Sequence, residues 1–173
     1  MNHSLLKITL LCCFLLTTVL LPAQEVITME NASSRSLKGL EAAEAAIAQN
    51  DLSKALSELQ KVLEKEPKFV DALFLRGSVF YDQKHYDWAE GDFEVALRLA
   101  PPDYNKVALF QLAVIEWRLR KFSESAAHFE AYLASDATNE RQRELAEEYL
   151  EKARFSAEAY AHTVPFDPMR LSD

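Results

Sequence analysis

Glycine and cysteine are both scarce in this chain of 173 residues, and each shortage excludes a class of site. The three glycines, Gly39, Gly77 and Gly91, lie too far apart to form a glycine-rich loop that holds a phosphate group. The two cysteines, Cys12 and Cys13, both fall in an apolar run near the N-terminus. If that run is removed, the remaining chain has no disulfide, thiolate nucleophile or cysteine ligand for zinc.

Positive charge and catalytic motifs are also lacking. The chain has 19 Lys and Arg against 27 Asp and Glu, a net charge of −8, and no basic patch. An acidic chain without such a patch binds nucleic acid poorly, so we exclude that partner. His85, His128 and His162 show no metal-ligand spacing, and the glutamates follow helix faces rather than forming an acid–base pair. We therefore predict no catalytic residue, no metal and no cofactor.

Residues 1–23 are predicted to be a signal peptide. Lys7 supplies the positive charge, and Ile8 to Leu21 form an uncharged apolar run that is short for a membrane span. A Leu-Pro-Ala sequence ends the run, so cleavage is expected after Ala23, with Gln24 as the first mature residue. An uncleaved anchor is the alternative. We expect export to the periplasm or the outer membrane, with no stable membrane insertion after cleavage.

Hydrophobic residues recur with a period near 3.6 almost throughout the chain, and no useful length alternates with period two. The sequence therefore predicts an all-α protein. The expected helices form three pairs, at residues 36–49 and 52–65, 70–83 and 86–99, and 105–119 and 122–134.

The stretch from Val70 to Pro101 predicts two antiparallel helices in close contact. Gly77 and Ala89 are small, so the helices can cross there, and Phe93 can fill the space beside the crossing. Pro101 lacks an amide hydrogen and disfavours helix in the preceding residue, so it ends the second helix. This pattern resembles the tetratricopeptide repeat, a helix–turn–helix unit of about 34 residues. One departure is Arg76, where that family usually has Leu.

The same pattern recurs in both directions along the chain. Ala55 and Pro67 lie 34 residues before Ala89 and Pro101, and the downstream spacing is 36 residues. The resemblance implies three units, at about 36–69, 70–103 and 106–137, stacked as a right-handed solenoid. The other matching positions are Tyr86 and Ala96 in the second unit and Phe122 and Phe129 in the third.

Three further segments surround the repeats. Residues 24–35 are polar and aperiodic, so we expect a flexible mature N-terminus. Residues 138–162 carry one apolar stripe, which predicts a helix that caps the last repeat. The alternative is the start of a fourth, incomplete repeat. Residues 163–173 contain two prolines and are expected to form a tail or linker.

The tail sequence VPFDP at residues 164–168 resembles a junction in envelope proteins of the Bacteroidetes. In that family a signal peptide and tetratricopeptide repeats precede a β-propeller and often an OmpA-like domain, both absent here. This resemblance implies a role in envelope assembly or secretion. It also leaves open that the chain is the N-terminal fragment of a larger protein.

The repeat resemblance implies a concave surface lined by the first helix of each unit, which binds an extended or helical peptide. The expected positions are spaced i, i+4 and i+7 and so share one helix face. They lack the Lys and Asn of the family's carboxylate-binding groove, so a chaperone's free C-terminus is not the expected partner. The positions are Leu40, Glu44 and Ile47; Phe74, Ser78, Tyr81 and Asp82; and Phe110, Val114, Trp117 and Arg118.

Two alternative functions remain, and they depend on whether the aromatic residues among these positions are exposed or buried. If they are exposed in a patch, the chain is a module that binds a protein or peptide partner. If Phe74, Phe110 and Trp117 belong to the core, or the capping helix fills the groove, the chain is a structural spacer or scaffold. The sequence names neither the partner nor the oligomeric state.

Overall fold

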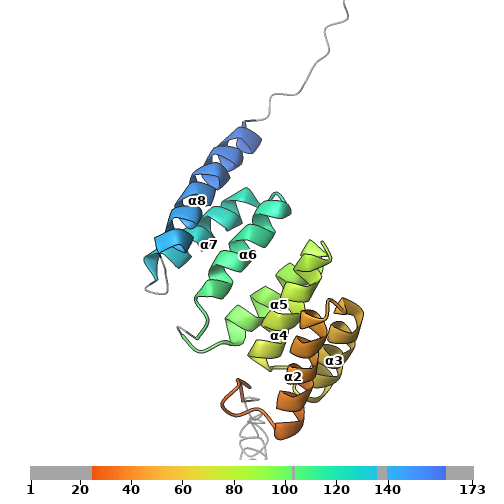
Figure 1. The fold of residues 1–173 in the computed structure, drawn as a ribbon. Helices are drawn as coiled ribbons and strands as arrows, with labels where there is room; N and C mark the ends of the chain where they lie inside the picture. The colour runs from red at the N-terminus through yellow and green to blue at the C-terminus, as the bar shows by residue number, and fades with distance from the viewer. Residues whose placement is uncertain (1–24, 103, 136–139, 163–173) are drawn as a thin grey trace, which may run out of the picture.

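The computed structural model describes residues 25–102, 104–135 and 140–162. The predicted signal peptide, the C-terminal tail and the first residues of the predicted cap lie outside these ranges. The helices stack in pairs along one direction (Figure 1). Within the described residues the helices are α2 (Ser34–Ala48), α3 (Leu52–Lys65), α4 (Val70–Asp82), α5 (Tyr86–Leu99), α6 (Val107–Arg118), α7 (Phe122–Ala134) and α8 (Glu140–Ala161).

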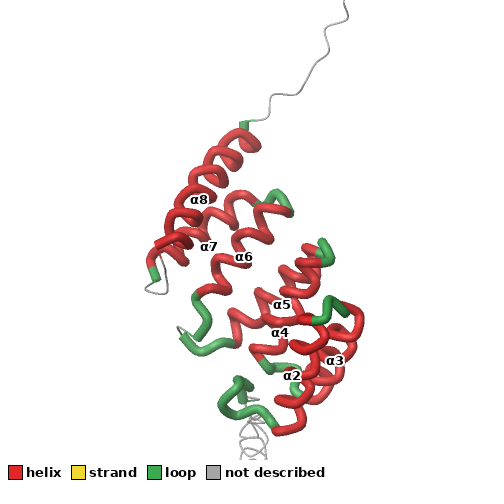
Figure 2. The backbone as a smooth tube through the Cα atoms, viewed as in Figure 1, coloured by secondary structure: helices red, strands yellow, loops and turns green. Residues whose placement is uncertain are grey.

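The six helices α2 to α7 form three hairpins, as expected from the helical periodicity. Figure 2 shows the two helices of each hairpin side by side, joined by a short turn. The predicted helix ends differ from the observed ones by at most two residues. The all-α solenoid is therefore confirmed.

One backbone device makes the turn inside every hairpin. Asn50, Lys84 and Arg120 occupy the same place after the first helix, with φ of 59°, 63° and 62°. The residue after it donates its backbone N–H to a carbonyl in the last turn of the helix. In the second hairpin, for example, the N–H of His85 donates to the carbonyl of Phe80 at 2.9 Å. This pattern is a Schellman motif, which usually places glycine at the positive-φ residue. Here three non-glycine residues adopt that conformation.

The crossing of α4 and α5 lies where the small residues predicted it. A Cβ added to Gly77 would lie 2.7 Å from Cδ2 of Phe93 and 3.3 Å from the carbonyl oxygen of Ala89. Phe93 is 1% exposed, so no room exists for a side chain at Gly77. In the third hairpin the buried hydroxyl of Ser125 donates to the carbonyl of Ala113 at 2.7 Å. The crossings in the second and third hairpins therefore both depend on small residues.

Arg76, which departs from the repeat pattern, joins three helices. Its guanidinium donates two hydrogen bonds, each 2.7 Å long, to the two carboxylate oxygens of Asp92 on α5. A third donor lies 3.1 Å from Oε1 of Gln60 on α3. The side chains of Arg76 and Asp92 are only 21% and 10% exposed. A paired charge thus stands at the position where the repeat pattern usually has leucine.

Helix α8 packs along α7 and covers the end of the solenoid. Ala146, Leu150 and Ala153 are buried in a second core cluster with Phe129 of α7. The ring of Tyr149 stacks on Phe129, with centroids 5.8 Å apart. Because this face would otherwise expose apolar side chains, α8 serves as the end cap.

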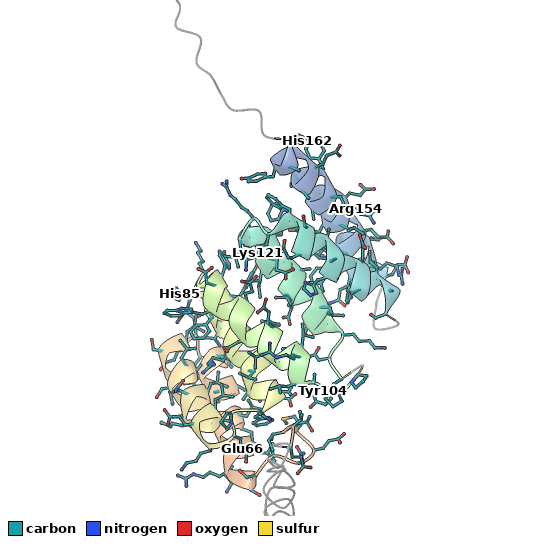
Figure 3. All side chains as sticks on the ribbon, turned by 180° about the vertical axis from the view of Figure 1, so that it is seen from behind. Glu66, His85, Tyr104, Lys121, Arg154 and His162 are labelled. Carbon is teal, nitrogen blue, oxygen red and sulfur yellow. The ribbon has the colours of Figure 1, made fainter. Side chains whose placement is uncertain are left out.

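The segment before α2 is attached to the repeats rather than being a loose tail, so that expectation needs correction. Ile27 forms a parallel bridge with Phe69, and its N–H donates to the carbonyl of Lys68 at 3.1 Å. The N–H of Met29 donates to the carboxylate of Asp71 at 3.1 Å. Tyr104 donates to the same carboxylate at 2.8 Å and lies beside this segment (Figure 3). The polar composition did not predict that backbone groups of this segment pair with the turn between α3 and α4 and with Asp71 at the start of α4.

Candidate functional site

A hollow of about 370 Å³ opens between the first helices of the second and third hairpins. This volume falls within the roughly 300–1,000 Å³ typical of ligand pockets. Its walls come mainly from α4 and α6, and a buried ring of α5 forms part of its floor. The lining residues are Ser78, Tyr81 and Asp82 of α4, Phe93 of α5, and Phe110, Gln111, Val114 and Ile115 of α6.

The hollow is where the repeat register predicted a concave surface. Tyr81 on α4 and Phe110 and Val114 on α6 were all expected to face a partner, and all three line the hollow. Phe110 and Val114 are spaced by four residues and therefore share one helix face. Gln111 also lines the hollow and was not predicted from the sequence, although it lies three residues before Val114 and so belongs to the same stripe.

The aromatic walls of the hollow are held by further rings. Phe110 is half-buried, and its ring meets Phe129 and Tyr132 edge to face, with centroids 5.6 and 5.4 Å away. The ring of Tyr81 lies 5.5 Å from that of Tyr86. Such contacts stabilise one orientation of each ring. The hollow is therefore a preformed feature of the fold.

Two predicted groove residues belong to the core instead. Leu40 is 3% exposed and Phe74 is 6% exposed. Phe74 packs against Phe93 of the paired helix, with ring centroids 5.5 Å apart. Each residue lies three positions before the small crossing residue of its helix, Ala43 or Gly77, and so points toward the partner helix. Leu40 and Phe74 therefore belong to the core and not to the expected concave surface, and Ile47 is half-buried against the same core.

Helix α8 covers Trp117 but does not fill the hollow. The half-buried ring of Trp117 meets Tyr149 of α8 edge to face at 5.9 Å and Phe122 at 6.3 Å. Its indole nitrogen is buried and has no hydrogen-bond partner within the described structure. None of the residues that line the hollow comes from α8. Trp117 is therefore a packing residue at the edge of the groove, and replacing it would test stability as much as binding.

Arg118 is the last residue of α6 and is not among the residues that line the hollow. Its exposed guanidinium lies 5.8 Å from the ring centroid of Trp117. The neighbouring hydroxyl of Tyr81 raises the pKa of Arg118, chiefly through a hydrogen bond, so the guanidinium stays charged. Arg118 thus connects α6 to α4 across the groove.

A separate group of charged side chains lies between α5, α6 and α7. Nδ1 of His128 is 2.8 Å from Oε2 of the buried Glu116, and Lys121 pairs with Glu90. Burial raises the pKa of Glu116, and the hydrogen bond to Glu116 raises the pKa of His128. The His128–Glu116 pair joins the two helices of the third hairpin, whereas the Lys121–Glu90 pair joins the third hairpin to the second, so both pairs have a structural role.

The described residues contain no group of three or more His, Cys, Asp or Glu side chains placed to hold a metal ion. Across the same ranges, no helix combines the length and the apolar character that crossing a membrane requires.

A family model for the tetratricopeptide repeat matches residues 40–104. This match spans part of α2 and all of α3, α4 and α5. Among curated proteins, none matches the chain.

Solved tetratricopeptide domains share the fold at low sequence identity. The first such domain of Spaghetti (RPAP3), bound to the HSP90 peptide SRMEEVD, is 20% identical, with a TM-score of 0.59 over 75% of this chain and 98% of that one. The TPR2B domain of yeast Sti1, in a complex with pHsp70, is 13% identical, with a TM-score of 0.62 over 71% and 98%. The Sgt2 domain from Aspergillus fumigatus is 18% identical, with a TM-score of 0.62 over 82% and 93%. The chain therefore has the tetratricopeptide repeat fold.

Proposed function

We propose that this chain is a protein-interaction module whose concave face binds an extended or helical segment of a partner protein. The hollow between α4 and α6 carries the proposal. It is preformed, it is lined largely by apolar and aromatic side chains, and α8 leaves it open. A bulky apolar side chain of the partner would enter the hollow and act as the anchor of the interface.

The similar folds support a peptide as the class of partner. The Spaghetti domain is bound to a short peptide from HSP90, and the Sti1 domain is in a complex with pHsp70. The hollow of this chain has no Lys or Arg among its lining residues. We therefore propose an apolar anchor and not a free C-terminal carboxylate.

Export is the second part of the proposal, and its support is in the sequence. The apolar run from Ile8 to Leu21 and the Leu-Pro-Ala sequence after it have the features of a cleaved signal peptide. The partner would then be met in the periplasm or at the outer membrane, in envelope assembly or secretion. N-terminal sequencing of the protein from fractionated cells tests this. We expect Gln24 in the periplasmic fraction, and a cytosolic protein beginning at Met1 would overturn the proposal.

A structural spacer is the alternative function, and one observation favours it. Phe74 is in the core and Trp117 is covered by α8, so the exposed aromatic surface is smaller than the repeat pattern suggested. In this alternative the helices only hold neighbouring parts of an assembly at a distance.

A hollow-filling variant distinguishes the two functions. Gln111 lines the hollow and is exposed, so Gln111→Trp adds bulk there at little cost to the fold. Glu151→Trp places the same ring on the exposed face of α8 and is the matched control. We expect Gln111→Trp alone to lose a co-purifying partner, with both melting temperatures unchanged. Equal capture by both variants would favour the spacer.

A further inference from the structure

We infer that the partner segment presents a basic side chain next to its apolar anchor, an inference that rests on the proposed function of the hollow. Asp82 is the one charged residue among the side chains that line the hollow. The remaining lining residues are apolar, aromatic or uncharged polar groups. A partner whose apolar side chain enters the hollow therefore passes a carboxylate at its rim.

The position of Asp82 strengthens its attraction for a cation. It is the last residue of α4, at the end of the helix that carries the partial negative charge of the helix dipole. No ion pair among the described residues involves Asp82, whereas Arg76 on the same helix is paired with Asp92. The Asp82 carboxylate is exposed and is available to a partner.

The acidic character continues along the concave face onto α2. Glu41 and Glu44 stand at the repeat positions that Gln111 and Val114 occupy on α6. Both glutamates are exposed, and no ion pair of the described residues includes them. Arg118 is the opposing cation on α6, and it is engaged by Tyr81 and the ring of Trp117.

A lysine or arginine of the partner fits this arrangement. Its aliphatic stem can lie along the ring of Tyr81 while its charged group reaches the Asp82 carboxylate. The net charge of −8 attracts basic segments at longer range and repels acidic ones. The groove therefore selects an apolar and basic segment over an apolar and acidic one.

Selection from a phage-displayed library of random short peptides tests the inference on the full chain. Peptides that bind the parent but not Gln111→Trp should pair a bulky apolar residue with Lys or Arg. The double variant Glu44→Lys/Asp82→Lys should select Asp or Glu in place of the basic residue. Glu151→Lys on the exposed face of α8 is the matched charge reversal, and it should leave the selected sequences unchanged.

One selected peptide is then titrated by fluorescence anisotropy. Each reversed groove charge should weaken the affinity of the chain for this peptide about two- to fivefold, the range for an exposed ion pair. Added salt should reduce the difference in affinity between the parent and the charge-reversed variants. Selected peptides without basic residues, or an equal loss with Glu151→Lys, would overturn the inference while the groove remains a binding site. A library that enriches nothing over Gln111→Trp would overturn the groove function, and the inference with it.

Discussion

Phe93 stabilises the crossing of α4 and α5, because it packs against both Gly77 and Phe74. The side chain is 1% exposed, and truncating a buried phenylalanine removes transfer energy and leaves a cavity. We expect Phe93→Ala to lower the free energy of unfolding by about 3–5 kcal/mol. Chemical denaturation measures this, and a midpoint equal to that of the parent would show that the repeat register is wrong.

Arg76 and Asp92 form a pair whose members depend on each other. Arg76→Leu restores the residue usual in the repeat family but leaves the Asp92 carboxylate, which is 10% exposed, without its two donors. We expect a loss of about 1–3 kcal/mol, the cost of an unsatisfied buried polar group. The double variant Arg76→Leu/Asp92→Leu should recover most of that loss. If the single and double variants unfold at the same denaturant concentration, the pair has no such role.

The pair of His128 and Glu116 makes stability depend on pH. The pKa of each group is raised in the folded state, so the folded chain holds its protons more tightly than the unfolded chain. The stabilisation from His128 is complete below about pH 6.5, its unfolded value, and is lost as the pH rises through the higher folded value.

We therefore expect the free energy of unfolding to fall as the pH rises from about 6.5 through the raised pKa of His128 in the folded state. His128→Gln should flatten that fall, because the glutamine side chain does not titrate. His85→Gln changes an exposed histidine outside the pair and should leave the slope as it is in the parent. Denaturation curves over this pH range measure the free energy of unfolding of each variant. Equal slopes against pH for the parent and His128→Gln would contradict the role of His128 in the pH dependence.

At the scale of the helix, the turn inside each hairpin carries a small strain. A left-handed conformation costs an L-residue about 1–2 kcal/mol, and glycine avoids that cost but loses more entropy on folding. Lys84 has a φ of 63° and is exposed. We expect Lys84→Gly to stabilise the chain by about 0.5–1 kcal/mol. Lys38→Gly, in the middle of α2, should instead destabilise it by about 1 kcal/mol; thermal melts of both variants give the comparison.

The helices and their crossings could be predicted because local patterns determine them. Prolines, small residues and the 3.6-residue period all lie within one hairpin, so they fix where α4 and α5 begin, cross and end. The place of the hollow followed from the same register. Tyr81, Phe110 and Val114 needed only a common helix face to be assigned.

The rest depended on how the helices pack against one another and against the preceding segment, which the sequence does not show directly. Phe74 and Val114 both fit the predicted concave stripe, but which of them is buried depends on how closely the neighbouring helix packs against it. Phe74 packs against Phe93 of its own paired helix, and Trp117 is covered by Tyr149 of α8. The attachment of Ile27 beside Phe69 depends on main-chain hydrogen bonds, which leave no mark in composition.

For the whole molecule, the cap and the hollow have separate roles. Helix α8 covers the apolar end of the solenoid and the edge of the groove at Trp117, while the space between α4 and α6 stays open. The fold is thus closed where a stacked array needs protection and open where a partner segment can enter. The central claim is that binding occurs at this hollow.

Site-specific photo-crosslinking tests that claim most directly. A photoreactive amino acid at position 81 would lie in the hollow, and the same group at position 88 replaces a tryptophan that is 60% exposed and lies outside it. In the protein's own cells we expect one discrete partner adduct from position 81 and none from position 88. Adding Gln111→Trp should abolish the adduct. Adducts from position 88 alone, or an adduct from position 81 that persists with Gln111→Trp, would contradict the account.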